Sequence, residues 1–145
     1  MRRRVYTKSY IHGLPRLLDC GVTRRREEDL LPAEIHWEGD AREVLAGFPA
    51  SIRAEFGYSL WQLQQGRTPN SATRRMQSLG PGIWELKESD QKTWYRVMYL
   101  SRVRNVIYVL HCFEKRSHKT DRRDLEIVRE RLHRVRQRIR QERTE

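Results

Sequence analysis

The chain has 145 residues, and Lys and Arg exceed Asp and Glu enough to give a formal net charge of +11 and a pI near 10.3. This length fits a single core, and 37% hydrophobic residues suffice to build it, although the 34% charged share indicates long solvated segments. The charge favours a polyanionic partner such as nucleic acid, an acidic protein segment or an anionic membrane surface, or else a basic chain kept soluble by its charge.

Residues 1–33 show neither strand nor helix periodicity, and they end in a charge run closed by proline, RRREEDLLP. The basic N-terminus is not followed by the apolar segment of a signal peptide, and no apolar run approaches the ~18 residues of a membrane span. We therefore predict a poorly ordered basic extension over residues 1–33 and a single domain over residues 34–145, in a cytoplasmic protein that does not associate with a membrane.

The domain is expected to begin with a strand and two helices. Ile35 and Trp37 alternate with polar neighbours, which predicts a short strand ended by Gly39. Asp40 can cap a helix over residues 40–48, and Pro49 suits the first turn of a second helix over residues 49–66. The second helix carries apolar residues spaced four, four and three apart, namely Ile52, Phe56, Leu60 and Leu63.

The second half predicts strands and a final helix. The stretch 67–82 is expected to be a loop anchored by Leu79, followed by strands over residues 82–89, 93–101 and 105–115. Their short links predict antiparallel neighbours. Strict alternation in the last strand would place His111, Phe113 and Lys115 on one face, with Tyr108, Leu110, Cys112 and Glu114 on the other.

A long helix is expected to close the chain. From Leu125 to Ile139 its apolar residues step three, four, three and four, while arginine takes most other positions. The order strand, two helices, three strands, helix predicts an α+β domain with helices packed on a twisted antiparallel sheet. Cys20 and Cys112, the two cysteines of the chain, lack the spacing of a zinc site or disulfide framework, so no metal or other cofactor is predicted.

Four stretches, taken in order, carry a family resemblance: GYSLWQLQQG, LGPGIWEL, TWYRVMYL and IYVLHCFEKRSHKT. Over roughly residues 34–140 the chain resembles the phage-derived HigB-like toxins of the RelE/ParE superfamily, the toxin halves of type II toxin-antitoxin pairs. The resemblance implies the RelE/ParE-like sheet, with a helical hairpin after the first strand and a long C-terminal helix. It also implies a metal-independent mRNA endonuclease, usually ribosome-dependent, that inhibits translation and is silenced by a helix-turn-helix antitoxin.

Two alternatives stay open on the resemblance alone. ParE-like relatives share the fold and inhibit DNA gyrase without catalysis, and a prophage-derived relative can be inactive. Fold does not choose between these functions, so the choice depends on individual residues.

Metal-free RNA cleavage needs a cation to hold the charge of the phosphorane and a proton donor for the leaving 5′-oxygen. Arg96 corresponds to the strand arginine of the superfamily, and its planar fork can hold two phosphate oxygens. An ion pair with Glu85 is the alternative role, and we interpret Glu85 as an anchor for arginine rather than as a base. The resemblance also places Lys87 near the scissile phosphate.

The stretch FEKRSHKTDRRD, residues 113–124, is interpreted as the rim of this anion site. Relatives typically have Phe-x-Lys-Lys here and then Lys-Thr, whereas this chain has Arg116 in place of the second lysine. Arginine keeps the charge but cannot share a proton near neutral pH, so acid-base work is assigned to Lys115, Lys119 or His118. His118 has an ordinary pKa near the working pH, about 6.5, although a loop histidine is usually only solvated.

Three further residues are predicted to bind RNA. Arg116 belongs to the same basic stretch, Tyr95 can stack on a base, and Arg102 lies in the short link between the last two strands. His111, on an apolar strand face, is interpreted as a core histidine with its hydrogen bonds satisfied.

Overall fold

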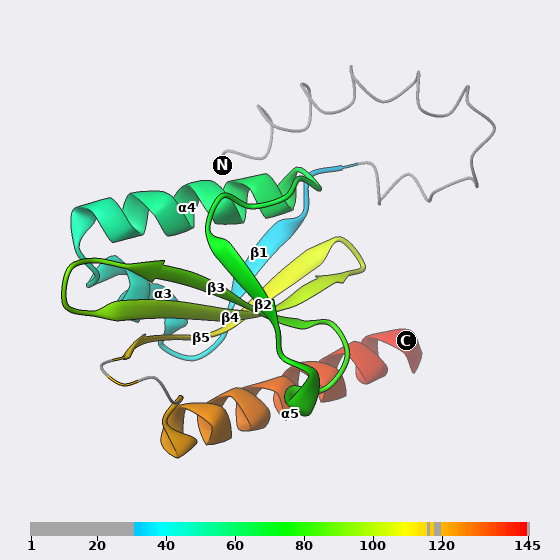
Figure 1. The fold of residues 1–145 in the computed structure, drawn as a ribbon. Coiled ribbons are helices and arrows are strands. Elements are labelled where there is room, and N and C mark those ends of the chain that lie inside the picture. The colour runs from blue at the N-terminus through cyan, green and yellow to red at the C-terminus, as the bar shows by residue number, and fades with distance from the viewer. Residues whose placement is uncertain (1–30, 116, 118–119, 145) are drawn as a thin grey trace.

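The computed structural model describes residues 31–115, 117 and 120–144. In chain order the elements are β1 (Glu34–Trp37), α3 (Ala41–Ala46), α4 (Ala50–Gln64), β2 (Ala72–Arg75), the 3-10 helix η2 (Gln77–Leu79), β3 (Ile83–Ser89), β4 (Trp94–Val103), β5 (Val106–Lys115) and α5 (Arg122–Thr144). The strands form one sheet in the order β1-β5-β4-β3-β2, with α3 and α4 on one face and α5 across the other (Figure 1).

This architecture confirms the predicted α+β class, the helical hairpin after the first strand and the long C-terminal helix. The sheet is mixed, because β1 pairs in parallel with β5 while the other three strand pairs are antiparallel. Short links predicted the antiparallel pairing of β3 with β4 and of β4 with β5. A parallel pair needs a long crossover. Here α3, α4 and the β2–β4 strands all lie between its two members.

The segment predicted as a loop over residues 67–82 contains β2 and η2, so that prediction is wrong in this part. All four residues of β2 are exposed, and the strand is held by its backbone pairing with β3 at the edge of the sheet. An edge strand without a buried face has no hydrophobic alternation, which is why periodicity did not predict this strand. Leu79 is buried, as predicted.

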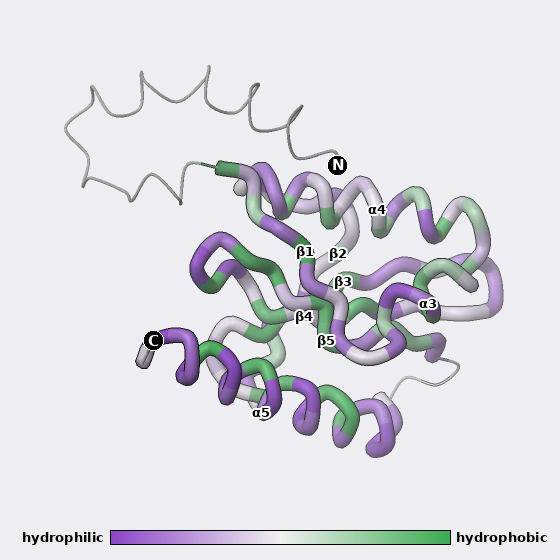
Figure 2. The backbone as a smooth tube through the Cα atoms, turned by 180° about the vertical axis from the view of Figure 1, so that it is seen from behind, coloured by the Kyte–Doolittle hydropathy of each residue, from purple (hydrophilic) through white to green (hydrophobic). Residues whose placement is uncertain are grey.

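Each face of the sheet carries its own apolar core. On the α3/α4 face, Phe56 is completely buried among neighbours from the helices and from β4. On the α5 face, Val128 and Val135 are completely buried. Figure 2 shows apolar segments recurring along the otherwise hydrophilic α5. The apolar spacing predicted for α4 and α5 therefore corresponds to the faces that pack on the sheet.

A β-bulge in β5 changes which residues share a face. Met98 pairs with His111 and Tyr99 with Val109, so Leu110 is an extra residue in β5. Leu110 consequently joins the α5-side core, whereas Cys112 lies in the core on the other side. The prediction that Leu110 and Cys112 share a face is wrong, because a β-bulge cannot be recognised in a run of residues that all favour strands.

The first described residues are attached to the domain rather than separate from it. Ala33 is buried, and its N–H donates to the carbonyl of Gln64 at 3.0 Å. The Asn105 side chain donates to the carbonyl of Pro32 at 3.1 Å. The remainder of the predicted extension lies outside the described residues. In the described part of the chain, no helix is long and apolar enough to cross a membrane.

Candidate functional site

The face of the sheet that carries α5 gathers cations from four strands. Strand register decides this, because directly paired residues point to the same face. Lys87 of β3 pairs with Arg96 of β4. Glu85, two residues before Lys87, pairs with Arg74 of β2. Lys115, at the end of β5, pairs with Trp94, two residues before Arg96. Below, the cationic cluster means the four cations around the carboxylate of Glu85: Arg74, Lys87, Arg96 and Lys115.

Glu85 lies beneath the cluster, and its side chain is only 2% exposed. Its Oε1 is 3.5 Å from the Nε of Arg96, whose side chain is 11% exposed and whose Nη1 donates to the carbonyl of Tyr95 at 3.1 Å. The ion pair between Arg96 and Glu85, given above as the alternative role of Arg96, is thus present. Burial raises the pKa of Glu85, and the surrounding cations, Arg96 first, oppose that rise. Glu85 and the carbonyl of Tyr95 are therefore the polar neighbours that orient the largely buried guanidinium of Arg96.

Lys115 is a buried lysine beside a second cation. It is 8% exposed, and its Nζ donates to the hydroxyl of Thr120 at 3.4 Å, just before α5 begins. Burial lowers the pKa of Lys115, the charge of Arg96 lowers it further, and Glu85 partly compensates. An ammonium group with a lowered pKa gives up its proton more readily, which suits a general acid.

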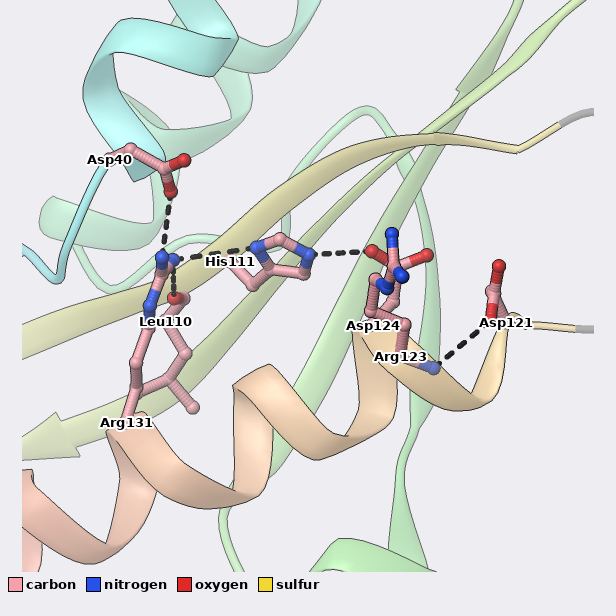
Figure 3. A network of polar contacts seen from close by, with 7 residues as sticks. All are labelled: Asp40, Leu110, His111, Asp121, Arg123, Asp124 and Arg131. Carbon is pink, nitrogen blue, oxygen red and sulfur yellow. Dashed lines mark hydrogen bonds and ion pairs between the residues drawn. The ribbon is translucent and has the colours of Figure 1, made fainter.

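A polar network beside the cluster fixes α5 to the sheet (Figure 3). The buried ring of His111 contacts Asp124 through Nε2 at 2.8 Å and Arg131 through Nδ1 at 3.4 Å. Arg131 also donates to the carbonyl of Leu110 at 2.9 Å and to Asp40 at 2.7 Å, and that hydrogen bond lowers the pKa of Asp40. His111 is therefore a satisfied core histidine, as predicted, and the network holds the first turns of α5 next to Lys115.

The cluster offers groups that suit phosphate chemistry. Within residues 31–115, 117 and 120–144, no group of three or more His, Cys, Asp or Glu side chains could hold a metal ion. Cys112 is buried, and burial raises the pKa of its thiol to about 12, so it is not an activated nucleophile. Cations held around a surface can instead bind an anionic group and stabilise charge that develops on it.

A family model described as "Phage derived protein Gp49-like (DUF891)" matches residues 43–133, more than half of the chain. The chain belongs to this Gp49-like family. The family lies in the RelE/HigB toxin-like group, which agrees with the resemblance seen in the sequence. No curated protein and no solved structure matches the chain. The family match spans β2 to β5, and so contains the whole cationic cluster.

Two predicted RNA-binding residues of this Gp49-like chain lie on the opposite face of the sheet. Tyr95 is buried against Phe48 of the α3/α4 layer, and its hydroxyl donates to Asp90 at 2.9 Å. Arg102 donates to the carbonyl of Gln64 at 2.8 Å and lines a pocket of about 420 Å³ between α4 and the sheet, together with Trp84. The fold does not bring either residue to the cationic cluster.

The other predictions divide into two groups. Arg96, Lys115 and Lys87 come together on the α5 face, while Arg116, His118 and Lys119 lie outside the described residues. Arg74 is the member of the cluster that sequence reasoning missed. It follows Thr73 in the segment predicted as a loop, and only recognition of β2 as a strand paired with β3 could have placed it beside Glu85.

Proposed function

We propose that this Gp49-like protein is a HigB-like toxin of a type II toxin-antitoxin pair that cleaves mRNA without a metal ion and thereby inhibits translation. The observation that carries the proposal is the arrangement of Arg96 and Lys115 on one face, with Arg96 fixed by Glu85 and Lys115 buried with a lowered pKa. One group is suited to holding negative charge and the other to giving up a proton.

In the proposed reaction the 2′-oxygen of the RNA attacks the adjacent phosphorus, and its proton passes to solvent. Arg96 and Lys87 hold the charge that develops on the non-bridging oxygens. Lys115 donates a proton to the 5′-oxygen as its bond to phosphorus breaks. The products are a 2′,3′-cyclic phosphate and a 5′-hydroxyl, so atoms and charge balance without a cofactor. Lys119 and His118 remain candidates for assisting proton transfer, and Arg116 for binding RNA.

The proposal includes the partners that the family resemblance implies. The substrate is mRNA in the cytoplasm, bound on the ribosome, and a helix-turn-helix antitoxin encoded beside the toxin silences it. The net charge of +11 supports a polyanionic partner of this kind.

Expression from an inducible promoter, in cells without the antitoxin, tests the proposal. Growth and translation should stop, and mapping of transcript ends should show new 5′-hydroxyl ends within mRNA. The variant Arg42→Ala, which removes an exposed cation from α3 on the other face, should behave as the unsubstituted protein does. Intact mRNA accompanied by double-strand DNA breaks would assign the protein to the gyrase inhibitors instead, and unchanged growth with intact mRNA would indicate an inactive relative.

A further inference from the structure

One flank of α5 carries a row of arginines that are not paired with any carboxylate of the described residues. They are spaced seven, four and three residues apart, which keeps them on one side of a helix with 3.6 residues per turn. From first to last the row is about 21 Å long at 1.5 Å per residue. Three of its members are exposed, and the second along the helix is half-buried. Below, the α5 track means Arg129, Arg140 and Arg143 together with the half-buried Arg136.

Other arginines of the same helix differ in their partners. Arg131 is paired with Asp40, Arg138 with Glu38, and Arg134 with Glu130. By contrast, within the described ranges none of the four arginines of the α5 track has a hydrogen-bonded or ion-paired carboxylate. Helix α5 thus has a neutralised side toward the β1–α3 turn and a side that keeps its positive charge.

The position of the track follows from its contact with η2. The guanidinium of Arg136 lies against Gly80, where a Cβ would be 3.1 Å from its Nη2. Gly80 follows η2, and only Met76 separates η2 from β2. The track therefore faces the β2 edge of the sheet, where Figure 1 shows η2 beside α5. Arg74 of the cationic cluster is exposed on β2 and lies on the face of the sheet that α5 covers. The track therefore continues the cluster along the same side of the molecule.

We propose that the α5 track binds the phosphate backbone of RNA on one side of the scissile phosphate, an inference that rests on the proposed function of the cationic cluster. A strand held at Arg96 and Lys115 would pass Arg74 and then follow α5. Unpaired arginines suit this role because each can hold two oxygens of one phosphate.

An acidic protein partner fits this surface less well. The core of a protein interface is enriched in large apolar and aromatic side chains. In the described part of the chain, the exposed large hydrophobic side chain is Tyr58, which lies on α4 at the other face of the sheet. A row of cations without apolar neighbours is typical of backbone binding to nucleic acid, which needs charge and little apolar contact.

Binding to 2′-O-methyl RNA measures the track without cleavage, because the attacking 2′-hydroxyl is blocked. The affinity of a labelled single-stranded oligonucleotide is determined by fluorescence anisotropy at several KCl concentrations. Arg129→Gln/Arg140→Gln should weaken binding and reduce the slope of log affinity against log salt by about 1.4, since each phosphate contact on a single strand contributes about 0.7. Glutamine has nearly the helix propensity of arginine, so α5 should persist.

The matched control is Arg42→Gln/Arg53→Gln, which removes two exposed cations from α3 and α4 and gives the same net charge. This control should leave the slope unchanged. Equal losses in both double variants, or no loss in the track variant, would overturn the inference. An unchanged slope combined with lost binding of a polyglutamate peptide would also overturn it, and would make the track a protein-docking surface.

The proposed function can fail independently of the track. If the unsubstituted protein binds 2′-O-methyl RNA with the expected slope, and the track variant lowers that slope, the track stands even when no RNA is cleaved. If RNA is cleaved but the slope does not depend on Arg129 and Arg140, the cleavage site stands and the track does not.

Discussion

Replacing Arg96 by glutamine, alone and together with Glu85, separates two functions of one guanidinium. Arg96 is the ion-pair partner of the buried Glu85, and in the proposed reaction it also holds the charge of the phosphorane. A loss of activity in Arg96→Gln alone would not show which function was lost. The second variant is therefore Glu85→Gln/Arg96→Gln, in which neither side chain is charged, and the reference for it is Glu85→Gln.

The contacts of Glu85 and Arg96 determine the expected changes in the free energy of unfolding and in the cleavage rate. In Arg96→Gln, Oε1 of Glu85 loses its partner at 3.5 Å, and Oε2 already has no hydrogen-bond partner in the described structure. A buried acceptor left unsatisfied costs about 1–3 kcal/mol, so the free energy of unfolding should fall by that amount. The double variant has two neutral amides and should recover most of it. The cleavage rate should fall by about 100- to 1,000-fold from Glu85→Gln to the double variant, because one preorganised donor is missing.

Urea denaturation gives the free energy of unfolding, and single-turnover cleavage of a labelled mRNA gives the rate. Recovery of stability without recovery of cleavage is the expected result. If the double variant cleaves as fast as Glu85→Gln, the part Arg96 plays is to neutralise Glu85, and the phosphate assignment is wrong. If Arg96→Gln is as stable as the unsubstituted protein, the ion pair contributes nothing measurable.

Two further predictions concern Lys115 and Arg131. As a general acid, Lys115 needs its proton, so the cleavage rate should fall as the pH rises through its lowered pKa, below the ordinary 10.5. Glu85 raises that pKa, so Glu85→Gln should move the falling limb of the pH-rate profile to lower pH, and an unmoved limb would remove Lys115 from this role. Arg131→Met should lower the free energy of unfolding by about 1–3 kcal/mol, because it leaves the Leu110 carbonyl without its charged donor. Urea denaturation should show a loss of about 0.5 kcal/mol or less for Arg134→Met, whose arginine forms an exposed pair, and equal losses would contradict this reasoning.

The parts of the fold that sequence reasoning predicted are those with a strong local period. The apolar steps of α4 and α5 identify the side that packs on the sheet, and short links define the antiparallel order β3-β4-β5. Strand β2 and the bulge at Leu110 have no such period, because β2 buries no side chain and the bulge depends on pairing with β4. The sequence therefore predicts which elements form, but not every face or edge.

The residues of the candidate site also differ in how far local sequence patterns predict them. Arg96 and Lys115 could be predicted because the strands that carry them are recognisable and adjacent, and the family resemblance named their positions. The contact of Arg131 with Asp40 joins residues separated by 91 positions, and no local pattern connects them. Tyr95 was predicted from its capacity to stack on a base and Arg102 from its place in the chain, whereas the register of β4 and the packing of α4 direct both to the other face.

The most direct test of the central claim is cleavage of an mRNA that carries a single 2′-deoxynucleotide at the mapped cut site, on ribosomes programmed with that mRNA. Loss of the 2′-oxygen should abolish the cut at that position, while the all-ribose mRNA is cut with 2′,3′-cyclic phosphate and 5′-hydroxyl ends. Cleavage at the deoxy position at an undiminished rate, or ends carrying a 5′-phosphate, would contradict a metal-independent attack by the 2′-oxygen at Arg96 and Lys115.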